Sequence, residues 1–201
     1  MVYPFSALFT RMNYIDRWGL MRNSRKESLS EHSANVASIA HVLAEISVSE
    51  FHAEDVRPER VAVTALYHDL SETLTGDMPT PVKYRNDEIK NSYKQVEAEA
   101  EENIVGMVPD FMSNSMNCYV KGEGLTLHEK QLIKAADKIG ALIKCIEEAQ
   151  SGNREFTSAE ESTRKAIEEI ELPELHYFTD HFLPAYSLTL DELMREILKE
   201  G

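Results

Sequence analysis

Apolar residues recur every three to four positions along most of the chain, a spacing that places them on one face of a helix. The clearest run follows an i, i+3, i+4, i+7 pattern and comprises Val36, Ile39, Ala40, Leu43 and Ile46. With Ser30 as the expected N-cap, this run predicts a helix over residues 30–48. No stretch alternates between apolar and polar residues for long enough to predict a strand, so we expect an all-α fold.

Three further segments show the helical period. Pro58 suits the first turn of a helix that should continue to about Glu72, after which two prolines and a glycine in residues 75–81 must interrupt it. A second helix is expected at 87–107. A third is expected at 126–150, where the sequence opens with a Thr-x-x-Glu capping box.

The remaining segments are shorter. Residues 109–124 are less regular and contain two glycines. Ser158 and Thr189 each stand three residues before a glutamate, which predicts two more capping boxes. Pro173 and Pro184 bound a short helix. Because we find no internal repeat and no linker, we expect one domain over residues 1–201.

The composition narrows the classes of partner. The 201-residue chain has a formal net charge of −14, so its surface repels nucleic-acid backbones and anionic membranes. The longest apolar run, residues 61–67, is far too short to span a bilayer. We therefore expect no nucleic-acid partner and no membrane partner. A small anionic substrate would need local positive charge from a metal ion or from arginines.

Two features bear on location. The chain starts without the basic and apolar segments of a secretory signal. Its two cysteines, Cys118 and Cys145, lie far apart and form no Cys/His zinc pattern, so we expect two reduced thiols. Together these features predict a cytoplasmic protein.

Two sets of polar residues interrupt apolar helical faces. A carboxylate at Asp137 has apolar neighbours and, if buried, must be paired in a salt bridge or bound to a metal ion. His68 and Asp69 are adjacent, and neighbouring residues on a helix point about 100° apart. Both reach one ion only if the end of their helix points at it. Otherwise they are a core histidine beside a surface charge.

The order of these residues is more specific than any one of them. His32, then His68 with Asp69, then Asp137 lie on three separate helical segments. This arrangement resembles the HD-domain metal-dependent phosphohydrolases. The resemblance implies a bundle of helices around one divalent cation held by these four residues. Imidazole and carboxylate ligands suit Co, Mn, Zn, Fe or Cu.

Further segments resemble one bacterial branch of that family, the 5′-deoxynucleotidases. They are Arg17-Trp18 with residues 20–23, and the segments 30–33, 67–72 and 75–84. The resemblance implies that a homodimer hydrolyses 2′-deoxynucleoside 5′-monophosphates to deoxynucleoside and phosphate. Two alternatives stay open. One is an HD phosphohydrolase that acts on triphosphates, cyclic dinucleotides or an alarmone, and the other is a helical regulator that binds nucleotide without turnover.

The resemblance also implies roles for single residues. Glu72, which helical spacing places on the side of His68 and Asp69, would orient or deprotonate the attacking water, or protonate the leaving oxygen. Arg17 would bind the substrate phosphate in bidentate fashion. Trp18, the one tryptophan of the chain, would pack near the sugar and leave no room for a 2′-hydroxyl.

The proline-rich loop adds candidates for binding the sugar or the phosphate: Asp77, Met78, Pro79 and Thr80. Asp77 would accept a hydrogen bond from the 3′-hydroxyl. His32 and Asp69 would face the substrate as well as the metal ion. Lys83 either adds positive charge to this region or lies on the surface as an ordinary lysine.

Overall fold

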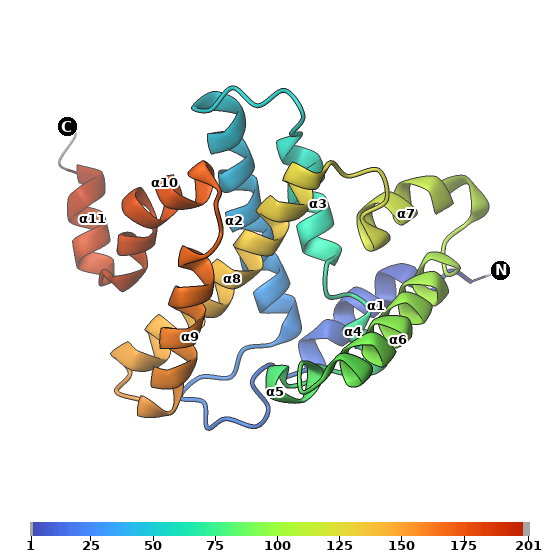
Figure 1. Ribbon diagram of the computed structural model, residues 1–201, viewed down its shortest axis with the longest axis horizontal. Helices are drawn as coiled ribbons and strands as arrows, with labels where there is room; N and C mark the ends of the chain where they lie inside the picture. Colours follow the sequence, from blue (N-terminus) through green and yellow to red (C-terminus); the bar gives the residue numbers. More distant parts are fainter. Residues whose placement is uncertain (1, 199–201) are drawn as a thin grey trace.

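A computed structural model describes residues 2–198, and the regular structure in that range is helical. The exception is one isolated antiparallel bridge between Asp16 and Ser28. Helices α2 (Leu29–Ser49), α3 (Pro58–Tyr67) and α8 (Leu127–Gln150) pack against one another at the centre of the molecule (Figure 1). The prediction of an all-α fold is confirmed. The prediction of one domain over residues 1–201 stays a prediction.

The other helices flank this centre on two sides (Figure 1). Towards the C-terminus lie α9 (Thr157–Glu168), α10 (Pro173–His181) and α11 (Leu190–Leu198). The opposite side holds α1 (Phe5–Arg11), α4 (Glu72–Thr75), α5 (Thr80–Lys83), α6 (Asp87–Val105) and α7 (Ser113–Lys121). Short 3₁₀ helices span Met12–Tyr14, Asp110–Met112, Arg154–Phe156 and Leu183–Ser187. Among residues 2–198, no helix combines the length and the apolar character that a membrane span requires.

Helix α2 begins at Leu29, one residue before the predicted start, and its N-cap is Ser28 instead of Ser30. The Ser28 hydroxyl accepts a hydrogen bond from the backbone of Glu31, and the Glu31 carboxylate accepts one from the Ser28 backbone at 2.8 Å. This reciprocal capping box requires a carboxylate three residues after the cap. Ser30 has Ser33 at that position, so it cannot form the box.

Helix α3 ends at Tyr67, so the predicted continuation to Glu72 is wrong. The carbonyl of Ala65 receives the backbone N–H of His68 at 3.4 Å, and His68 Nδ1 lies 2.6 Å from the same oxygen. The chain thus leaves the helix in a tight turn, which satisfies a carbonyl that a helix end would expose. Glu72 starts the separate helix α4.

Local sequence signals predicted some of the remaining boundaries and missed others. The capping boxes at Thr126 and Thr189 are both present. The one predicted at Ser158 is absent, because α9 continues from a 3₁₀ turn whose backbone at Phe156 is already helical. The irregular segment 109–124 contains helix α7, which the sequence pattern did not predict.

Two hydrophobic cores meet at the candidate site. The larger one lies among α2, α3, α8, α9 and α10, and the smaller one lies mainly among α1, α6 and α7. Along α2 the chain passes from the smaller core at Leu29 to the larger one at Val36, with His32 between them. After α3 it returns to the smaller core at Leu70, with His68 just before it. Both histidines therefore lie at the junction of the two cores.

An ion pair with a buried carboxylate joins α3 to α8. The Glu129 side chain is fully buried and receives Arg60 Nη2 at 2.6 Å and Arg60 Nε at 3.0 Å. The Arg57 backbone N–H also donates to it at 3.1 Å. Removing one member of such a pair leaves an uncompensated charge in the interior, which is strongly destabilising.

We therefore expect Arg60→Ala to lower the free energy of unfolding by about 3 kcal/mol, measured by urea denaturation followed by circular dichroism. The matched control is Arg164→Ala, which breaks an exposed pair with Glu160 on α9 and should change stability by less than about 0.5 kcal/mol. Equal losses in the two variants would contradict the structural role of the buried pair.

Candidate active site

His32 lies in the first turns of α2 with its side chain fully buried against α8. The two helices approach closely at Gly140. A Cβ at that position would lie 3.3 Å from His32 Cε1 and 3.1 Å from a methyl carbon of Val36, closer than side chains normally pack. The missing side chain of Gly140 therefore makes room for the imidazole. A glycine within an otherwise apolar helix was the available sequence signal for this contact.

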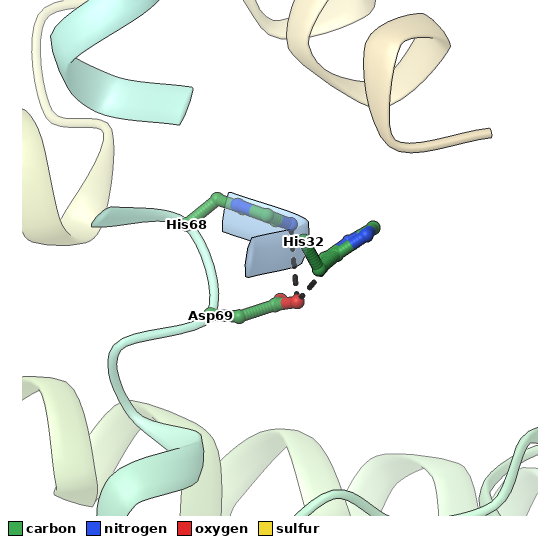
Figure 2. Close-up of side chains that lie close together, drawn as sticks. All are labelled: His32, His68 and Asp69. Carbon is green, nitrogen blue, oxygen red and sulfur yellow. Dashed lines mark ion pairs between the residues drawn. The ribbon is translucent and has the colours of Figure 1, made fainter. Parts of the chain in front are cut away.

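His68 and Asp69 reach the same point because they lie in the turn after α3. Figure 2 shows one carboxylate oxygen of Asp69 facing both imidazole rings. Asp69 Oδ2 is 3.1 Å from His68 Nε2 and 3.7 Å from His32 Nε2. The turn thus resolves the divergence that two adjacent helical residues would have. The ligand atoms of His32, His68 and Asp69 lie within 4.8 Å of one another.

Asp137 brings a second carboxylate to the cluster from α8. Its Oδ1 is 3.1 Å from His32 Nε2 and 3.9 Å from His68 Nε2. Burial alone would raise the pKa of Asp137, but the hydrogen bond and charge of His32, together with the charge of His68, lower it below its usual value. The structure therefore brings together all four residues that the sequence singled out as metal ligands.

The chemistry of these donors fits a cation. His68 Nδ1 lies 2.6 Å from the Ala65 carbonyl and donates its proton there. Among residues 2–198, the buried Nε2 forms no hydrogen bond of good geometry, although Asp69 Oδ2 lies 3.1 Å from it. Metal-binding histidines commonly use one ring nitrogen in this way to orient the other. Burial would lower the pKa of His68, but the charges of Asp69 and Asp137 outweigh it and raise the pKa to about 9. Negative charge is thus concentrated where a cation would bind.

The cluster is buried on one side and open on the other. The His32 and His68 side chains are 0% and 14% exposed, whereas those of Asp69 and Asp137 are 23% and 34% exposed. Solvent or a substrate therefore reaches the cluster from the side of the carboxylates. A buried site closed on all sides would suit a purely structural ion, whereas a catalytic one needs open positions.

Arg17 supplies positive charge beside the cluster. Its side chain is 14% exposed, and Nη1 lies 2.9 Å from Glu27 Oε2 and 2.7 Å from His32 Nδ1. Because a guanidinium only donates, His32 Nδ1 is the accepting atom of this contact, while His32 Nε2 faces Asp137 at 3.1 Å. Burial would lower the pKa of Arg17, but Glu27, Asp137 and other nearby carboxylates outweigh it and raise the pKa.

Trp18 follows Arg17 in an unusual backbone conformation, with φ at 59°. Its indole Nε1 donates to Glu27 Oε2 at 3.3 Å. Its ring packs edge-on against Phe156, with centroids 5.3 Å apart. The Trp18 ring is thus held by Glu27 and by the 3₁₀ helix that contains Phe156. The sequence offered no signal for the contacts of Glu27, which lies nine positions from Trp18 and ten from Arg17.

Glu72 is buried near the cluster, and its Oε2 has no hydrogen-bond partner within the described part of the chain. Burial, followed by the charges of Asp69 and Asp77, raises the pKa of Glu72 to about 9. The structure therefore places Glu72 beside the cluster, but as the first residue of α4 rather than as part of the helix that was predicted to carry His68.

In the loop after α4, Asp77 is the residue that interacts most with the site. Burial raises the pKa of Asp77, while the charge of Arg17 and the backbone of Trp18 oppose that shift. Met78 and Pro79 are half-buried and Thr80 is exposed.

Lys83 is held by Glu97 at 2.6 Å and lies over the ring of Tyr93. It acts on the site only as a nearby positive charge that lowers the pKa of Glu72. Its direct ion pair therefore belongs to the packing of α5 against α6, not to the cluster.

Comparison with known proteins identifies the family. The family model described as 5′-deoxynucleotidase YfbR-like matches residues 4–186. A 5′-deoxynucleotidase of Cronobacter sakazakii is 42% identical over 192 residues, covering 96% of each chain. A 5′-deoxynucleotidase of Vibrio vulnificus is 44% identical over 189 residues, covering 94% of this chain and 97% of the relative.

Solved structures support the same grouping. An HD-domain phosphohydrolase from Listeria innocua superposes with a TM-score of 0.78 at 25% identity, and the match covers 98% of each chain. A cyanophage S-2L HD phosphohydrolase, bound to dA and one catalytic Zn²⁺ ion, shares the fold with a TM-score of 0.60 at 18% identity, over 89% of this chain and 96% of that one. The HD-domain helical bundle expected from the motifs is therefore confirmed, and the chain belongs to the YfbR-like 5′-deoxynucleotidase family of HD-domain phosphohydrolases.

Proposed function

We propose that this protein hydrolyses 2′-deoxynucleoside 5′-monophosphates to deoxynucleoside and phosphate. The observation that carries the proposal is the position of Arg17, a mostly buried cation 2.7 Å from the ring of His32 and therefore directly beside the candidate ligands. A phosphate held there would contact the guanidinium on one side and the metal position on the other. The acidic chain otherwise offers little to attract such a substrate.

We assign His32, His68, Asp69 and Asp137 as ligands of one divalent transition metal ion. Imidazole nitrogens with carboxylate oxygens accept Co, Mn, Zn, Fe or Cu. When bound, such an ion lowers the pKa of a bound water and neutralises charge on phosphoryl oxygens. The partly exposed carboxylates leave room beside it for both, in agreement with a catalytic rather than a structural site.

The protein's own side chains have separate roles in the proposed reaction. Arg17 binds and orients the phosphate, because its planar guanidinium matches two phosphate oxygens. Glu72 moves a proton at the attacking water or at the leaving 5′-oxygen. Asp77 accepts a hydrogen bond from the 3′-hydroxyl, in the loop whose residues Met78, Pro79 and Thr80 line the approach to the sugar. His32 and Asp69 face the substrate as well as the ion.

The sugar preference tests this assignment. We expect wild-type protein to favour dAMP over AMP in kcat/KM, and Trp18→Ala to reduce that preference by about 10-fold or more, since a steric contact of this kind is worth about 1–3 kcal/mol. Phosphate release from paired deoxy- and ribonucleoside monophosphates, with divalent metals added back after chelation, measures both. Equal wild-type rates on dAMP and AMP would overturn the sugar argument. Faster release from triphosphates would favour another HD phosphohydrolase activity.

We also propose a homodimer in the cytoplasm. Helix α11 exposes an apolar face in the single chain, with Leu190, Met194 and Ile197 exposed at 74%, 44% and 69%. Such a face is typical of a surface that another chain covers. The two cysteines are free, which is in keeping with a reducing compartment.

Light scattering after size-exclusion chromatography should report about twice the 22.9 kDa chain mass for the wild type. Ile197→Glu should shift the protein to a monomer, because a charge in an apolar interface is costly to bury. Arg195→Gln on the polar side of α11 is the control and should leave the dimer intact. A wild-type monomer at every concentration would exclude this assembly.

A further inference from the structure

We propose that Glu27 is a positioning residue that holds Arg17 and Trp18 together in the geometry that deoxynucleotide recognition requires. The inference rests on the proposed function, because it assigns a task to a residue beside that same site. One carboxylate oxygen, Oε2, receives Arg17 Nη1 at 2.9 Å and Trp18 Nε1 at 3.3 Å. The residue proposed to bind the phosphate and the residue proposed to face the sugar are thus tied to a single atom.

The backbone presents Glu27 to both partners. An antiparallel bridge joins Asp16 to Ser28, and the Arg17 backbone N–H donates to the Glu27 carbonyl at 2.9 Å. Adjacent residues of the two short segments are therefore paired whether or not the carboxylate is present. Removing the carboxylate should change the side-chain positions of Arg17 and Trp18 without separating the segments that carry them.

The Glu27 side chain is 8% exposed, so its charge acts in a poorly solvated setting. Arg17 is surrounded by carboxylates, because Asp69, Asp77 and Asp137 also act on it. Without Glu27 the guanidinium would be drawn only towards those three, two of which are candidate metal ligands. Glu27 therefore keeps the guanidinium of Arg17 beside the metal position and prevents it from moving onto the carboxylates that would bind the ion.

Trp18 also needs an external restraint. Its φ of 59° lies in the left-handed region, which is unfavourable for a residue with a side chain and is typically maintained by surrounding contacts. The Trp18 carbonyl accepts from the Met21 backbone at 2.9 Å and from Asn23 Nδ2 at 3.3 Å, which holds the backbone turn. The hydrogen bond to Glu27 fixes the indole, and the ring of Phe156 limits its rotation.

The segment that carries Glu27 is anchored to α8, the helix of Asp137. The Glu148 carboxylate accepts from the backbone N–H of Ser24 at 2.8 Å and of Arg25 at 3.3 Å. Lys144 donates to both Glu148 and the Arg25 carbonyl. The loop that carries Glu27 is therefore fixed to α8, the helix that also carries the candidate metal ligand Asp137.

The single tryptophan of the chain offers a direct test with the metal-loaded protein. We expect Glu27→Ala to shift Trp18 emission to longer wavelength and to increase its quenching by acrylamide, with no substrate present. The KM for dAMP should rise by about 10-fold or more, because the guanidinium loses the charge-assisted hydrogen bond that holds it in place. The preference for dAMP over AMP should fall, while kcat changes less than KM.

Two further variants separate positioning from general stability. Glu27→Gln keeps the size and one acceptor oxygen, so its emission spectrum and KM should lie between those of the wild type and Glu27→Ala. Asp16→Asn is the matched control, because Asp16 lies in the same paired segments but its carboxylate binds the exposed Lys26. It should leave emission, KM and sugar preference unchanged.

Unchanged Trp18 emission in Glu27→Ala would overturn the proposal, and so would a loss of kcat with no change in KM or sugar preference. If Glu27→Ala does not fold, Glu27→Gln decides the question by the same readouts. The emission measurement does not depend on turnover. A protein that fails to hydrolyse dAMP but shows the shift would refute the proposed function while retaining the role of Glu27 in placing Trp18.

Discussion

Replacing Glu72 with glutamine should lower kcat for dAMP by about 10²–10⁴-fold, the usual contribution of a positioned proton-transfer group. The carboxyl group is buried and lies near Asp69 and Asp77, and no group in residues 2–198 forms a hydrogen bond with its Oε2. Glutamine fills the same volume but carries no transferable proton. Substrate binding should persist, because Arg17 and the candidate ligands are untouched.

The same substitution should stabilise the metal-free protein at pH 8. Burial, then the charges of Asp69 and Asp77, raises the pKa of Glu72 from 4.5 to about 9. Between these values the folded protein holds a proton that the unfolded chain releases, so stability falls as the pH rises through this window. Glutamine has no proton to lose, and its advantage should grow from nothing below about pH 4.5 to on the order of several kcal/mol near pH 9.

Thermal denaturation in the presence of chelator, at several pH values, measures this difference. The chelator matters because a bound cation would itself change the charge balance around Glu72. Glu147→Gln, an exposed glutamate on α8, is the control and should show no such pH-dependent gain. If Glu72→Gln keeps full turnover, Glu72 has no role in the reaction, whatever the effect of the substitution on stability.

Asp137→Asn should weaken divalent metal binding by at least about 100-fold and remove detectable phosphate release at ordinary metal concentrations, since loss of even an outer partner of a metal ligand costs about 10–100-fold. The asparagine retains the shape but not the charge that lies 3.1 Å from His32 Nε2 and 3.9 Å from His68 Nε2. The ion would lose both a donor oxygen and one of the two charges that attract it.

Titration calorimetry with Zn²⁺ or Mn²⁺, together with phosphate release at rising metal concentration, tests this expectation. Partial recovery of turnover at high metal concentration would still agree with a weakened site. Glu147→Gln again serves as the control on the same helix. Wild-type metal affinity in Asp137→Asn would exclude Asp137 as a ligand and reduce the site to the three residues His32, His68 and Asp69.

The helical architecture could be predicted because its signals are local. A period of 3.6 residues and capping boxes act within one or two turns, so they are legible without any knowledge of the fold. The candidate ligands were identified for a related reason. A histidine or carboxylate on an apolar helical face must find a polar partner, and the order of these residues matched a known family.

Local reasoning failed where a side chain and the backbone use the same carbonyl group. The apolar period continues past Tyr67, yet the carbonyl of Ala65 is taken by the backbone and the ring of His68, and the helix ends there. That early end is what directs His68 and Asp69 to one point (Figure 2). A helix continuing to Glu72 would have pointed the two side chains about 100° apart.

By itself, the sequence determined that the fold is helical, which residues are candidates for the chemistry, and to which family the chain belongs. Only the tertiary structure decided that Asp137 meets His32 across 105 positions, that Gly140 leaves space for the imidazole, and that Glu27 binds Arg17 and Trp18 together. The reason is physical. Helix formation depends on neighbours three and four residues apart, whereas these contacts exist only after two separate cores have packed against each other at the site.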